Sequence, residues 1–213
     1  MTITAQHPTL GDARSLPDAN IWPMRIAITG AHGVGKSTLA TRISQILMLP
    51  GLPTPGRTMA EQGLPVNKAA TVVSQTVAWL MQYRFEHEID AWVASRSLID
   101  VWAYASQAAD RGDLDSVEQA LMQELTSATR LAIKDAYDEL IYVPPRITLV
   151  ADDARSAEES FQRSTDAEIR AALADWGVRH VEVDVRDEEA VQAMIARWRN
   201  GLWGSPCLNA NDS

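Results

Sequence analysis

The residues best suited to chemistry form a short glycine-rich run. Residues 30–37 read GAHGVGKS, which matches the pattern Gly-x4-Gly-Lys-Ser/Thr. Glycines let the backbone bend closely around a polyphosphate, and successive N–H groups ahead of a helix polarise the loop positively. The lysine supplies a charge for the β- and γ-phosphates, and the serine hydroxyl suits Mg²⁺. The run therefore predicts a phosphate loop for ATP and Mg²⁺.

The loop residues divide into expected roles. We expect Lys36 to act on the transferring phosphate and Ser37 to ligate the metal, while His32 is a bystander or touches phosphate or acceptor. The purely structural alternative is a glycine-rich turn with an incidental lysine. It is disfavoured because a β-prone run precedes the motif and a hydrophobic pattern of helical periodicity follows it. The expected ATP contacts are Gly30, Ala31, His32, Gly33, Val34, Gly35, Lys36, Ser37 and Thr38.

The elements that must position this loop alternate between strands and helices. The hydrophobic pattern predicts strands over 24–29, 91–94, 140–143 and 178–185. It predicts helices over 36–47, 69–90, 98–109, 114–135, 152–175 and 188–199, with prolines breaking the chain after the first. Strands separated by helices favour an α/β fold of three layers around a mostly parallel sheet.

Length and charge set the broad class. The chain has 213 residues and a net charge of −9, which disfavours duplex nucleic acid and anionic membranes. We expect one domain over 23–200, a flexible arm at 1–22 and a flexible tail at 201–213. The single cysteine, Cys207, excludes an intrachain disulfide framework and a multi-cysteine zinc site. With neither a long apolar run nor a signal-like start, a soluble cytoplasmic protein is expected.

Several segments together resemble a known family. They read RIAITGAHGVGKSTLA, GRTMAEQGLPVNKAATVVSQ, RSLIDVWAYA, YVPP and DDARSAEESFQRSTDAEI, between about residues 25 and 185. They are similar to the small P-loop kinase-like ATPases, which are related to the nicotinamide-riboside kinase part of bifunctional NAD regulators and to deoxynucleoside and thymidylate kinases. The resemblance implies a five-stranded parallel sheet of order 2-3-1-4-5, ATP–Mg²⁺ as donor and a small acceptor. Because such kinases are often dimers, the resemblance also suggests that the protein forms a homodimer.

The resemblance also suggests roles for residues near the third family strand. Arg96-Ser97 matches the Arg-Ser of the family's Asp-Arg-Ser, whose arginine touches the acceptor, but Ser95 replaces the aspartate. A glutamate that relatives carry shortly before the arginine equivalent to Arg57 is also missing. Asp100 is either a compensating base or metal orienter, or only a helix-start acid favoured by the dipole.

A helical lid is implied over about residues 152–170. Such lids close over ATP and bring arginines to the transferring phosphate. Arg155 and Arg163 are the candidates in this segment. The alternative is a solvated polar helix in which Arg155 pairs with Glu158 or Glu159.

The acceptor pocket is expected beside the helix over 69–90. Gln75 could pair with a base edge and Trp79 could stack on its ring, although a tryptophan is more often core packing. Asn67 is a substrate candidate whose first interpretation is an N-cap. Arg57, in a Pro/Gly loop, is the candidate contact for an anionic substrate.

These observations predict a P-loop kinase of nucleotide metabolism. It would move the γ-phosphate of ATP to a nucleoside, nucleotide or related small metabolite. One alternative is a regulatory NTP-binding switch or ATPase, which the two missing acids favour. Another is a kinase of a modified base in DNA, which the negative charge disfavours.

Overall fold

The fold is built on a four-stranded parallel sheet. The computed structural model describes residues 24–66, 69–145 and 153–200, with side chains from 159 onward in the last range. The strands β1 (Arg25–Thr29), β2 (Trp92–Ala94), β3 (Glu139–Tyr142) and β4 (Val181–Glu182) lie in the order β2-β1-β3-β4. In the register, Ala27 pairs with Ala94 on one side and with Leu140 on the other.

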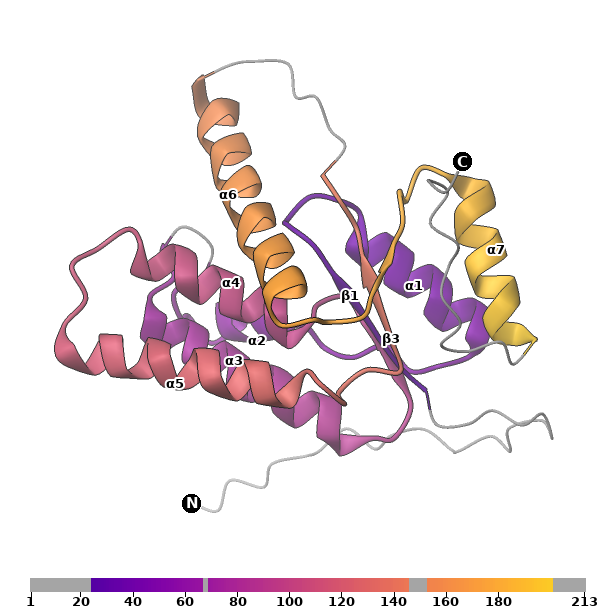
Figure 1. Ribbon diagram of the computed structural model, residues 1–213, viewed down its shortest axis with the longest axis horizontal. Coiled ribbons are helices and arrows are strands. Elements are labelled where there is room, and N and C mark those ends of the chain that lie inside the picture. Colours follow the sequence, from indigo (N-terminus) through magenta and orange to yellow (C-terminus); the bar gives the residue numbers. More distant parts are fainter. Residues whose placement is uncertain (1–23, 67–68, 146–152, 201–213) are drawn as a thin grey trace, which may run out of the picture.

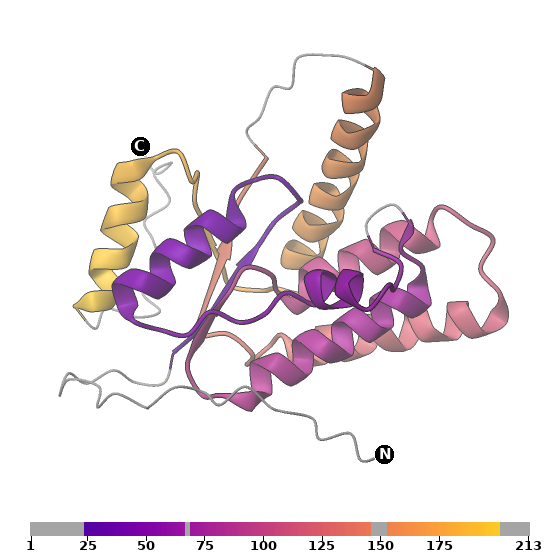
Figure 2. The ribbon, with the colours of Figure 1, turned by 180° about the vertical axis from the view of Figure 1, so that it is seen from behind.

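Helices cover both faces of the sheet. They are α1 (Lys36–Leu47), α2 (Pro55–Glu61), α3 (Val72–Glu88), α4 (Leu98–Ala109), α5 (Ser116–Ala132), α6 (Asp153–Asp175) and α7 (Glu188–Arg199). Figures 1 and 2 show α1 and α7 on one side of the sheet and α3 to α6 on the other. The expected α/β class with helices on both faces is therefore confirmed.

Side-chain alternation along the strands divides the core into two parts. Ile26, Ile28 and Ile141 face the cluster shared with α1 and α7. Ala27 and Leu140 face the larger cluster beneath α3, α4, α5 and α6. Because successive strand residues point to opposite faces, both faces of the sheet are apolar, as expected of a buried parallel sheet.

The expected fifth strand is reduced to a single bridge. Gly51 bridges Val93 of β2 in parallel, and the Leu52 N–H donates to the Val93 carbonyl at 2.9 Å. The prolines at 50, 53 and 55 lack an N–H and cannot extend this ladder. Among the described residues the sheet therefore has four strands, and the prediction of five is wrong because the expected edge strand is not formed. The order of the four strands agrees with the predicted order once that edge strand is left out.

Helix α2 was not expected, because prolines were interpreted as breakers. Pro55 stands in its first turn, where a missing N–H costs no helical bond. The helix seals one side of the larger core through Met59, which is fully buried. Elsewhere the predicted helices agree with the structure to within a few residues at each end.

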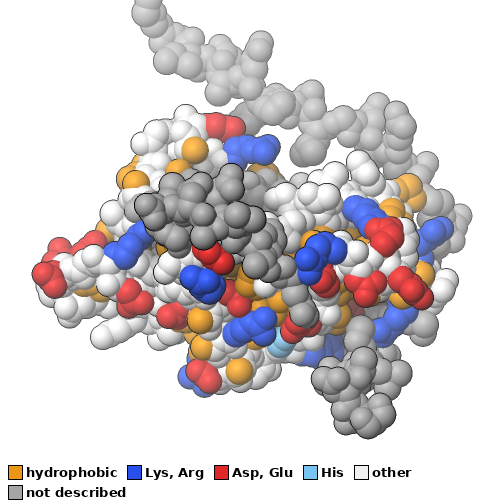
Figure 3. Space-filling model, turned by 90° about the horizontal axis from the view of Figure 1, so that it is seen from above, with side chains coloured by type: hydrophobic (Ala, Val, Ile, Leu, Met, Phe, Trp, Pro, Cys, Tyr) orange, Lys and Arg blue, Asp and Glu red, His pale blue; other side chains and the backbone are white. Residues whose placement is uncertain are grey.

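The expected arm and tail lie outside the described residues. The expected lid region falls partly within them, because α6 runs without a break from Asp153 and its last turns pack into the core through Ile169 and Leu173. Within the described part of the chain, no helix is both long and apolar enough to cross a membrane. On the face seen in Figure 3, acidic and basic side chains are interspersed where the described surface is visible.

Candidate active site

The phosphate loop joins β1 to α1 at the carboxyl end of the sheet. Gly30, Gly33 and Gly35 have φ angles of 146°, 75° and 95°, which favour glycine. A Cβ on Gly30 would lie 2.4 Å from the carbonyl oxygen of Val143, directly after β3. No described side chain caps the start of α1, so its first N–H groups are available to an anion.

Lys36 lies folded back into this loop. Its ammonium donates to the carbonyl oxygens of Gly30 and Ala31 and stands 3.6 Å from the Asp100 carboxylate. Only 6% of the residue is exposed. Burial lowers the pKa of Lys36 to about 8, although the neighbouring Asp100 carboxylate opposes the shift. The lysine side chain thus lies within the loop itself, held by two loop carbonyl groups and close to one carboxylate.

Asp100 connects the loop to the start of α4. The carboxylate is fully buried and accepts the Ser97 N–H and the Ser97 hydroxyl, both at 2.8 Å. It also accepts the Gly30 N–H at 3.3 Å. With Ser97 it forms the capping box of α4. The helix-cap and site interpretations of Asp100 are therefore compatible, because one carboxylate has both sets of contacts.

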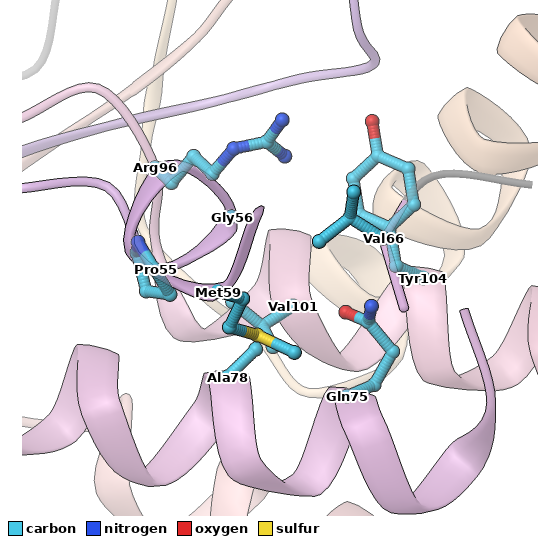
Figure 4. Close-up of a pocket in the computed structure, with 9 residues that line it drawn as sticks. All are labelled: Pro55, Gly56, Met59, Val66, Gln75, Ala78, Arg96, Val101 and Tyr104. Carbon is cyan, nitrogen blue, oxygen red and sulfur yellow. The ribbon is translucent and has the colours of Figure 1, made fainter. Parts of the chain in front are cut away.

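A pocket lies beside this segment, between α2, α3 and α4. Figure 4 shows the Gln75 amide and the Arg96 guanidinium directed into it and the Tyr104 ring along its side. The Arg96 guanidinium lies 5.0 Å from the centre of the Tyr104 ring. The complete lining is Pro55, Gly56, Met59, Val66, Gln75, Ala78, Arg96, Val101 and Tyr104.

Gln75 is a polar residue in the wall of this pocket. The residue is 8% exposed, and its amide points into the pocket (Figure 4). Among the described residues, the amide is not one of the buried side-chain groups that lack a hydrogen-bond partner, so it is open to the pocket, where a ligand can bond it. The cavity volume is about 40 Å³, enough for a few water molecules.

Helix α6 reaches the phosphate loop through two residues that the sequence did not single out. The Gln162 amide donates to the His32 carbonyl at 2.6 Å. The Phe161 ring lies 5.5 Å from the His32 ring and 5.9 Å from the Tyr104 ring. Phe161 therefore stands between the loop and the pocket. Spacing within one helix gives no signal for such a contact, because it depends on how α6 docks.

The other predicted residues are placed unequally. Arg57 is exposed on α2, next to the pocket residues Pro55 and Gly56. Trp79 is buried in the core and stacks on Tyr83 at 5.3 Å, outside the pocket lining. Asn67 and the side chain of Arg155 lie outside the described residues.

Arg163, Ser37 and Thr38 are on the surface. The Arg163 guanidinium is 65% exposed and pairs with Glu159 at 3.2 Å, one turn earlier on α6. Ser37 and Thr38 are exposed at the start of α1. The described residues contain no group of three or more His, Cys, Asp and Glu side chains that could form a metal cage.

Solved structures with this fold include two kinds of protein. The chain superposes on NadR in complex with NAD and AMP-PNP with a TM-score of 0.62 at 17% identity, over 85% of this chain and 50% of that one. It superposes on M. mycoides deoxyadenosine kinase with bound dCTP with a TM-score of 0.57 at 16% identity, over 84% and 100%. The chain thus spans about half the length of the NadR chain. At these identities the likeness shows a shared fold.

Sequence comparison identifies the family. No curated protein sequence matches the chain. The profile of the family described as AAA domain matches residues 25–190, which is most of the chain and includes the phosphate loop. The resemblance to P-loop kinase-like ATPases is confirmed by this match and by the fold, and the chain belongs to the AAA domain family as a P-loop nucleotide-binding domain.

Proposed function

We propose that the protein is a phosphotransferase. It moves the γ-phosphate of ATP to a nucleoside, nucleotide or related small acceptor bound between α2, α3 and α4. The observation that carries this proposal is the position of Arg96, whose guanidinium enters the pocket while Asp100, one helical turn later, contacts Lys36. One short segment therefore joins the phosphate loop to a pocket into which the Gln75 amide points.

The donor side uses the phosphate loop. Lys36 and the loop N–H groups hold the β- and γ-phosphates, and Lys36 leaves the Gly30 and Ala31 carbonyl oxygens to do so. When Lys36 turns toward the phosphates, Asp100 loses its cationic partner. The Asp100 carboxylate can then orient a metal ion beside the phosphates.

The residues present fit Mg²⁺. The Ser37 hydroxyl and the Asp100 carboxylate are hard oxygen donors, and Mg²⁺ typically uses few protein ligands together with phosphate oxygens and water. Ser37 would hold the ion directly and Asp100 would orient it. When bound, the ion neutralises charge on the transferring phosphate.

The acceptor side uses the pocket and its rim. We propose that Arg96 positions the acceptor, that the Gln75 amide bonds its polar edge, and that exposed Arg57 meets an anionic acceptor at the rim. Arg163 would leave Glu159 and approach the phosphates together with Arg155. Phosphoryl transfer depends mainly on positioning and charge neutralisation, so this set suits the chemistry without a carboxylate at position 95.

The test is ADP production from Mg-ATP with a panel of nucleosides, nucleoside monophosphates and nicotinamide riboside, using Lys36→Ala as the blank. Acceptor-dependent ADP release that Lys36→Ala abolishes supports the proposal. Gln75→Leu should then raise the acceptor KM and leave the KM for ATP unchanged. ADP release that no acceptor changes would contradict it and favour the regulatory ATPase, for which the serine at position 95 is the specific observation.

A further inference from the structure

A buried carboxyl group lies behind the proposed site and takes no part in it directly. Glu86, near the end of α3, is 4% exposed. The Gln82 amide donates to its Oε1 at 2.7 Å, and the Tyr137 hydroxyl donates to its two oxygens at 3.2 Å and 3.3 Å. Burial of a carboxyl group is unfavourable, so a hydrogen-bonded one in the core requires an explanation.

The two partners of Glu86 both continue to the main chain of the site. The Gln82 amide also donates to the Arg96 carbonyl oxygen at 3.2 Å. The Tyr137 hydroxyl accepts the Leu98 N–H at 2.8 Å. One carboxyl group is therefore linked to the residue before Ser97 and to the residue after it.

This segment fixes the geometry of the proposed site. Ser97 is the N-cap of α4, with an extended backbone at φ −111° and ψ 171°. Arg96, whose guanidinium enters the pocket, directly precedes Ser97, and the turn that Ser97 starts carries the carboxylate of Asp100. The first N–H groups of a helix lack helical partners, so Tyr137 supplies an acceptor that α4 does not.

We infer that Glu86 is a positioning residue, which acts through Gln82 and Tyr137 to hold Arg96 at the pocket and Asp100 against the phosphate loop. The inference rests on the proposed phosphotransfer for its kinetic consequence only. The hydrogen-bonded network itself is independent of the reaction.

The ionisation of Glu86 gives a way to follow this network. Burial raises the pKa of Glu86 to about 8. The groups facing it are Gln82 on its own helix, Tyr137 before β3, Asp100 on α4 and Arg25 on β1. Lys36, on the other side of Asp100, also has a pKa of about 8, so its titration must be removed to isolate that of Glu86.

The kinetic arm compares four variants at pH 7. Tyr137→Phe and Glu86→Leu break the network and should lower kcat by about tenfold or more with the KM for ATP changed less than about twofold, because a small misplacement of acting groups is costly. Glu86→Gln keeps a neutral acceptor and should stay within about threefold of wild type. The matched control is Thr126→Val on α5. It removes the hydroxyl that accepts the indole N–H of Trp102 at 2.9 Å, and Trp102 is on the same helix, α4, as Leu98 and Asp100. This variant should leave kcat unchanged.

The second arm needs no activity. The ¹⁵N resonances of the Arg96 guanidinium and the Leu98 amide are followed from pH 6.5 to 9.5 in the Lys36→Met background. A shared midpoint near pH 8 that Glu86→Gln removes is expected. Resonances that do not respond in this background overturn the inference, as does a kcat for Tyr137→Phe equal to that of Thr126→Val. If wild type transfers no phosphate, the proposed function fails and the resonances alone decide the positioning role.

Discussion

The ion pair between Lys36 and Asp100 should be the strongest electrostatic contact that holds the phosphate loop in this arrangement. The two side chains are 7% and 0% exposed, and their charged atoms are 3.6 Å apart. At an effective dielectric constant of about 20, this separation corresponds to an attraction of about 4 to 5 kcal/mol. Desolvation and rearrangement reduce the measurable coupling, so we expect about 2 to 3 kcal/mol at pH 7.

A double-mutant cycle with Lys36→Met, Asp100→Asn and the double variant measures this coupling by urea denaturation. The coupling should weaken above pH 8, because Lys36 then loses its proton. The surface pair of Arg42 and Glu188, whose side chains are 27% and 66% exposed, is a matched control and should show a much smaller coupling. A coupling for Lys36 and Asp100 below about 0.5 kcal/mol would refute the account of the loop as held by this pair.

Three further predictions concern the same region. Because burial raises the pKa of Glu86 from 4.5 to about 8, the stability that its neutral form gives is complete below about pH 4.5 and is lost as pH rises to 8. The unfolding free energy of Glu86→Gln relative to wild type should therefore be a few kcal/mol larger at pH 8.5 than at pH 5, as measured by urea titration. The same difference at both pH values would contradict the assignment. Gly30→Ala should lower the free energy of unfolding by about 2 kcal/mol or more, because its Cβ would lie 2.4 Å from the Val143 carbonyl oxygen at a φ of 146°. The control Gly112→Ala, with no atom within 4 Å of the added Cβ, should change the stability little in the same thermal unfolding experiment. Equal losses in the two variants would refute the close approach of Gly30 to Val143. ATP binding should be accompanied by uptake of a proton near pH 8, because the pKa of Lys36 is about 8 in the structure and bound phosphates favour its charged form. Calorimetry in two buffers of different ionisation enthalpy should detect this uptake in wild type. The same uptake in Lys36→Met would contradict the assignment.

The helices were largely predictable because their local signals agree with their packing. Helices α4 and α7 begin and end where the periodicity and the capping residues indicate, at Leu98–Ala109 and Glu188–Arg199. The edge of the sheet was not, because the family resemblance implied a strand that the prolines after α1 prevent. Helix α2 was missed for a related reason, since proline breaks the interior of a helix but is favoured in its first turn, where Pro55 stands.

The donor side of the site was more predictable than the acceptor side. The phosphate loop is contiguous in sequence, so its spacing alone indicates its geometry. The pocket is assembled from three helices, and Met59 and Tyr104 line it through packing that no spacing encodes. Trp79 shows the limit of helical spacing, since it lies one turn from Gln75 yet packs into the core.

The phosphotransfer proposal is tested most directly by following the labelled γ-phosphate of ATP. The protein would be incubated with Mg²⁺, γ-³²P-ATP and each acceptor of the panel, and the products separated by chromatography. The account predicts label on one acceptor class, abolished by Lys36→Ala and weakened at low acceptor concentration by Gln75→Leu. Label released only as inorganic phosphate, at a rate that no acceptor changes, would contradict it.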